Sequence, residues 1–98
     1  MQNPLSAELI DERLCELIKR MNPVQVRQYL ELSQRFAVFI SQDRKLEFAE
    51  LSDFLTSALA ESSTEAYGVF LSTVHMYSGE LTKAMSIVLE LEYAQNAR

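Results

Sequence analysis

Apolar side chains recur at three- and four-residue steps along almost the whole chain, the spacing that gathers them on one face of an α-helix. Glycine and proline occur only at Pro4, Pro23, Gly68 and Gly79, so few strong breakers interrupt this pattern. No run alternates apolar and polar positions as a half-buried strand does. The pattern predicts an all-α protein, a compact bundle of about five amphipathic helices at residues 4–21, 23–40, 44–60, 63–78 and 80–95.

Local signals predict where these helices begin and end. Both prolines follow asparagine, which is typical of an N-cap followed by the first helical residue. Ser62 and Glu65 have the spacing of a capping box before the fourth helix. Gly79 can adopt the left-handed conformation that ends a helix, so the last two helices should form a hairpin. The break between the second and third helices has no glycine or proline, and one long kinked helix is the alternative there.

The second and fifth helices have unusually wide apolar faces. At about 100° per residue, their apolar side chains cover arcs of roughly 180° and 200°, whereas a surface helix in a small bundle needs a stripe somewhat above 100°. We therefore expect the second helix to be central in the bundle. We also expect both helices to leave apolar surface for another molecule.

The fourth helix has three predicted sides. Val69 and Met76, two turns apart, are predicted to be exposed, whereas Gly68, Ser72 and His75 follow one another along a side where a neighbouring helix could pack closely. The inner face is predicted to consist of Ala66, Tyr67, Phe70, Leu71, Val74 and Tyr77.

Exposed apolar positions on these helices are candidate contacts with another protein, because a monomer seldom leaves a large apolar patch uncovered. The predicted protein-binding residues are Leu32, Phe39, Val69, Met76 and Leu89. Replacing Val69 by aspartate should weaken association and leave helicity intact.

Length and composition indicate one domain, residues 1–98, with 48% apolar residues as in an ordinary globular protein. No apolar run approaches the roughly 20 residues of a membrane span. The N-terminal residues lack the pattern of a signal peptide. The single cysteine, Cys15, cannot form an internal disulfide and is predicted to be half-buried. We expect a cytoplasmic protein.

The net charge of −5 disfavours sequence-independent binding to nucleic acid, which depends on lysine and arginine. Residues 46–98 hold eight acidic and two basic side chains, so this part of the chain is acidic. Its stripe of Glu47, Glu50 and Asp53 is either a solvated helix face or a docking site for a basic segment. The complement in a homodimer could come from Arg13, Lys19, Arg20, Arg27 and Arg35.

Catalytic, cofactor and metal sites are not predicted. His75 is the only histidine, and no second histidine or reactive cysteine has the spacing that a metal or nucleophile site requires. The protein is therefore not expected to be an enzyme.

Residues 66–95, under a third of the chain, resemble a single tetratricopeptide-type hairpin. Leu71 and Ser72 match the Leu-Gly pair of that family and Gly79 the turn glycine, and the second helix matches at Leu81, Ala84 and Val88. Three positions depart from the family pattern, namely Gly68, His75 and Leu91. The resemblance implies a concave surface that holds a helix or an extended peptide, as in small secretion chaperones and adaptors. Because one repeat is not stable alone, the preceding helices would cap it.

The sequence thus predicts a small non-enzymatic protein that binds another protein through an apolar helical surface, as an adaptor, anti-activator or chaperone-like regulator, and forms a homodimer. The alternative is a DNA-binding transcriptional regulator that uses the more basic N-terminal half. Its reader would be the second helix, with Arg27, Gln28, Glu31, Gln34 and Arg35 on the polar side.

Overall fold

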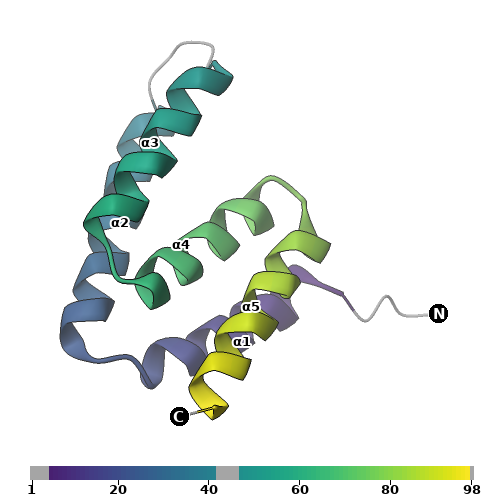
Figure 1. Cartoon of the computed structure of the whole chain (residues 1–98). Helices are drawn as coiled ribbons and strands as arrows, with labels where there is room; N and C mark the ends of the chain where they lie inside the picture. The colour runs from purple at the N-terminus through teal and green to yellow at the C-terminus, as the bar shows by residue number, and fades with distance from the viewer. Residues whose placement is uncertain (1–4, 42–46, 98) are drawn as a thin grey trace.

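The computed structural model describes residues 5–41 and 47–97 and contains five α-helices in these ranges. The predicted all-α bundle is confirmed (Figure 1). The helices are α1 (Ala7–Lys19), α2 (Pro23–Ser41), α3 (Phe48–Glu61), α4 (Thr64–Tyr77) and α5 (Leu81–Asn96).

Side chains cap the first two helices, and only the second of these caps is the predicted one. The Oγ atom of Ser6 accepts a hydrogen bond from the Leu9 amide at 3.1 Å, so α1 begins three residues after the predicted start. Pro4 lies outside the described residues. At the corner before α2, the side chain of Asn22 accepts from the Gln25 amide at 2.9 Å, and the Gln25 side chain accepts from the Asn22 amide at 3.2 Å. This reciprocal cap confirms the predicted corner.

The alternative of a single kinked helix in place of α2 and α3 is wrong. α3 lies alongside α2 and turns back from it (Figure 1). The ring of Phe54 in α3 lies 5.8 Å from that of Phe36 and 5.1 Å from that of Phe39, both in α2. The predicted start of this helix, at residue 44, lies outside the described residues, and α3 begins at Phe48.

The remaining two connections differ in how well the sequence predicted them. The N-cap of α4 is Ser63, whose Oγ atom accepts from the Ala66 amide at 3.2 Å, and not Ser62, which ends α3. The side chain of Glu65 accepts from Gln25 in α2. After α4, Gly79 has a φ of 82°, so the predicted left-handed turn into α5 is confirmed.

The central helix is α4 and not α2, because α4 contacts all four other helices. It separates two apolar cores that meet opposite sides of it. One core joins α4 to α1 and α5, and its buried residues are Ile10, Leu14, Leu17, Val69, Ala84, Met85 and Val88. The other joins α4 to α2 and α3, and its buried residues are Leu32, Ala58 and Phe70.

The α4–α5 hairpin is closely packed where the sequence predicted room for a neighbour. The Ser72 hydroxyl is fully buried and donates to the Ala84 carbonyl at 3.0 Å. A Cβ atom at Gly68 would lie 2.9 Å from a terminal methyl of Leu91. The small residue on α4 therefore accommodates the large one on α5.

The bundle is flat, with Cα extents of 39 × 39 × 17 Å. The α1 and α5 helices are also joined across the surface, where the Arg13 guanidinium makes a two-pronged ion pair with Glu92. Among the described residues, no helix has the length and apolarity to cross a membrane.

Candidate protein-binding groove

An apolar groove of about 480 Å³ lies between α1, α2 and α4. Its walls are α1 and α2, which diverge from the Asn22 corner, and residues of α4 complete it between them. We call this surface the groove. It is lined by Asp11, Leu14, Cys15 and Ile18 from α1, by Tyr29, Ser33, Phe36, Ala37 and Ile40 from α2, and by Phe70, Thr73, Val74, Met76 and Tyr77 from α4.

Several lining residues present apolar surface to solvent. Ile40 is 47% exposed and Tyr77 is 80% exposed, and Ala37 is also exposed. The hydroxyl of Ser33 is buried and has no hydrogen-bond partner among the described residues. Asp11 is the one lining residue with a charged side chain. The groove can therefore accept an apolar surface and offers few polar groups to orient it.

A second, shallower hollow lies at the far side of α2, lined by Gln34, Arg35, Val38, Phe39 and Phe54. The Arg35 guanidinium lies 5.7 Å from the centre of the Phe54 ring and 2.8 Å from a carboxylate oxygen of Glu61. These contacts cover part of the aromatic surface with a cation. This hollow is therefore less suited than the groove to an apolar partner.

Two of the predicted contact residues are in the cores and not on the surface. Val69 is 1% exposed, so its predicted exposure is wrong, and Leu32 is 3% exposed. Val69 faces α1 and α5, whereas the adjacent Phe70 faces α2 and α3, because α4 is packed on both sides. Tyr77, predicted to be internal, is instead on the surface.

The other three predicted contact residues are accessible but do not share one surface. Met76 is half-buried and lines the groove. Phe39 is half-buried and lines the shallower hollow. Leu89 is 51% exposed on α5, where the exposed ring of Tyr93 follows it one turn later.

The structure adds residues that the sequence analysis did not place in the groove. Ala37 and Ile40 belong to the wide apolar arc of the second helix, whose width predicted contact with another molecule but not the site of that contact. Cys15 is exposed at the groove, which corrects the prediction that it is half-buried. The sequence pattern did not predict that α1 lines this site, because the groove depends on the angle between α1 and α2.

Basic residues expected to recognise a partner are in part engaged within the chain. Arg13 pairs with Glu92, Lys19 with Glu16 and Arg35 with Glu61. Gln28, part of the expected DNA-reading side of α2, accepts from the Ser63 amide at 3.0 Å. These contacts reduce the positive and polar surface available on α1 and α2.

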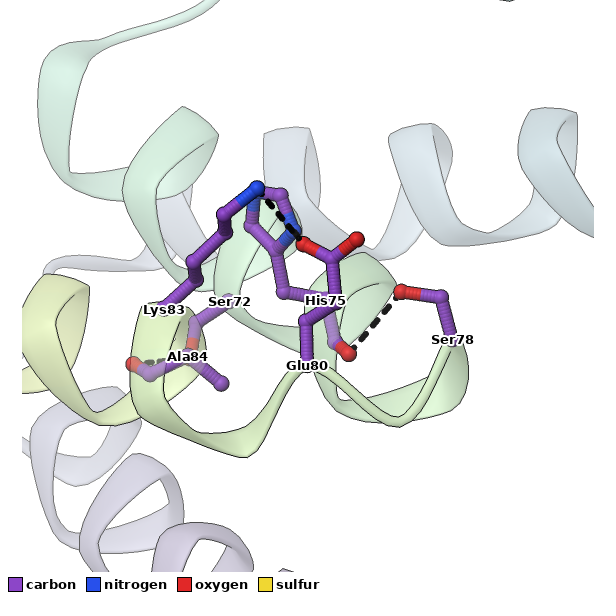
Figure 2. Close-up of polar contacts among 6 residues, drawn as sticks. All are labelled: Ser72, His75, Ser78, Glu80, Lys83 and Ala84. Atoms are coloured by element: carbon purple, nitrogen blue, oxygen red, sulfur yellow. Dashed lines mark hydrogen bonds and ion pairs between the residues drawn. The ribbon is translucent and has the colours of Figure 1, made fainter.

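The single histidine belongs to a polar cluster at the α4–α5 turn (Figure 2). Glu80 Oε2 lies 3.1 Å from both His75 Nδ1 and Lys83 Nζ. The contact with Lys83, assisted by His75, lowers the pKa of Glu80. The nearby Ser78 hydroxyl donates to the His75 carbonyl and not to its ring. The cluster thus joins the end of α4 to the start of α5.

No group of three or more metal-ligating side chains occurs in the parts of the chain that the structure describes. Comparisons with protein-family models, curated proteins and solved structures find no match. The groove is therefore interpreted from its own geometry and chemistry.

Proposed function

We propose that this protein is a small non-enzymatic interaction protein that binds a helix of a partner protein in the groove, in an adaptor, anti-activator or chaperone-like role. The observation that carries this proposal is an open apolar groove walled by two diverging helices, with Ile40 and Tyr77 exposed along it. Helix-in-groove binding is a common way to cover such a surface. The exposed thiol of Cys15 fits a reducing compartment such as the cytoplasm.

Self-association is a second part of the proposal and uses a different surface. Leu89 and Tyr93 stand one turn apart on α5, and both are exposed. Neither lines the groove. Such a pair on one helix face can pack against the same pair of a second copy in a homodimer. Sedimentation at micromolar concentration should detect a dimer that Leu89→Asp weakens, whereas an unchanged sedimentation profile would contradict this part.

The groove is tested by affinity capture from the native cell with two variants that each add one carboxylate. Ala37→Glu places the charge in the groove, and Ala60→Glu places it on the exposed surface of α3, away from the groove. We expect wild type and Ala60→Glu to capture the same protein and Ala37→Glu to lose it, because a buried unpaired charge is strongly unfavourable. Equal capture by all three proteins would refute binding in the groove.

A further inference from the structure

The two walls of the groove differ in charge. On α2, the lining residues Tyr29, Ser33, Phe36 and Ile40 recur at three- and four-residue steps and, with Ala37, form an uncharged strip about 17 Å long, at 1.5 Å per residue. This strip is too long for a compact small molecule. Its length fits an elongated occupant that makes apolar contacts over several turns.

The α1 wall is acidic. Glu8, Asp11 and Glu12 are exposed and, at about 100° per residue, project on the same side of α1 as Cys15, which lines the groove. None of the three carboxylates makes an ion pair with another described residue. Among the basic residues of α1, Arg13 projects away from this side and pairs with Glu92 on α5, and Lys19, which projects on this side, pairs with Glu16. One edge of the groove therefore carries negative charge that the described part of the chain does not neutralise.

An acidic edge beside an apolar floor favours one class of occupant. A helix lying in the groove would place its apolar side on α2 and α4 and one flank along α1. Acidic side chains on that flank would be repelled, whereas lysine or arginine would be attracted, and the low-dielectric apolar walls would strengthen the effect. A second copy of this chain brings the same net charge of −5, which opposes its approach to this edge.

We infer that the groove binds an amphipathic helix of another protein that carries basic residues along the flank facing Glu8, Asp11 and Glu12. This inference rests on the proposed function, because it names the chemistry of the helix that the groove accepts. It requires both features at once, an apolar side for α2 and α4 and a basic flank for α1.

The test uses two synthetic helices of about 18 residues, long enough to follow the strip on α2. Both have leucine at i, i+3, i+4 and i+7 spacing, and they differ only in lysine or glutamate at the same flank positions. Fluorescence anisotropy with the full-length protein should show at least about ten-fold tighter binding of the lysine helix at low salt. The preference should shrink as salt increases, because the carboxylates are exposed.

Two double variants with the same change in net charge complete the test. Asp11→Lys with Glu12→Lys should reverse the preference, whereas Asp53→Lys with Glu90→Lys, away from the groove, should retain it. Circular dichroism should show unchanged helicity in both, because all four residues are exposed. If both peptides bound equally well and Ala37→Glu abolished the binding of both, the inferred basic flank would be overturned and the groove proposal would stand. If neither peptide bound, or if Ala37→Glu left the binding unchanged, both proposals would be overturned.

Discussion

Two serines show how hydrogen bonding determines the contribution of a buried hydroxyl to the stability of this fold. Ser72 on α4 donates to the Ala84 carbonyl, and its side chain is fully buried between helices. The hydroxyl of Ser33 on α2 is also buried but has no partner among the described residues. A buried polar group stabilises a fold only when it is paired.

Replacing each serine by alanine should therefore have opposite effects. Ser72→Ala should lower the free energy of unfolding by about 1 kcal/mol through the lost hydrogen bond. Ser33→Ala should raise it by about 0.5 kcal/mol, because alanine favours the helix and no hydrogen bond is lost. Urea denaturation followed by circular dichroism measures both. Equal destabilisation by the two substitutions would show that Ser33 has a partner in solution.

At the same scale, the sequence could predict side-chain environments only on one-sided helices. On α1, the spacing of Ile10, Leu14 and Leu17 at four- and three-residue steps is enough to place them on one face, and all three are buried. On α4, apolar residues surround the helix, so periodicity could not separate Val69, which is buried, from Tyr77, which is exposed. Their environments depend on which helices pack against α4, and this information is not local.

At the scale of elements, the helices were predictable because their ends are encoded nearby. Asn22 caps the start of α2 through a residue three positions away, and the left-handed Gly79 follows the end of α4, both as predicted. Ser62 and Ser63 compete for the same cap, and the sequence favoured the wrong one. The groove was not predictable, since it depends on the angle between α1 and α2 and on the placement of α4 between them.

The polar cluster at the α4–α5 turn should make the hairpin sensitive to acid. Contacts with Lys83, and to a lesser extent His75, lower the pKa of Glu80. A carboxyl whose pKa is lower in the folded state stabilises the fold above the unfolded pKa, and this contribution is lost as the pH falls through the folded value. Glu80→Gln should therefore be less stable than wild type at neutral pH. The difference should close as the pH falls below 4.5, the ordinary value for this carboxyl.

Urea denaturation at several pH values measures this effect, and Glu90→Gln is the matched control. Glu90 is an exposed carboxylate on α5 without an ion pair to another described residue. Its replacement should leave the stability difference from wild type small at every pH. If Glu80→Gln lowered the free energy of unfolding by the same amount at every pH, the loss would not come from the charge of Glu80.

For the whole molecule, the burial of Val69 changes the outcome expected for its replacement by aspartate. An unpaired carboxylate in the core between α1, α4 and α5 is costly enough to exceed the marginal stability of a small domain. Val69→Asp should therefore lose its helical circular dichroism signal. Leu89→Asp, the matched change at an exposed apolar residue, should keep it. A folded Val69→Asp variant would contradict the packing of α4 described above.

The division of the apolar interior by α4 has a consequence for how the protein opens. Among the α3 side chains that the structure describes, only Ala58 is buried. The α3 helix also packs through the ring of Phe54 against the rings of Phe36 and Phe70. Units with few buried contacts unfold locally at a lower free energy than the rest of the protein. Amide hydrogen exchange should be fastest in α3 and slowest in α4 and α5. The α3 helix would then unfold locally while the α4–α5 hairpin remains folded.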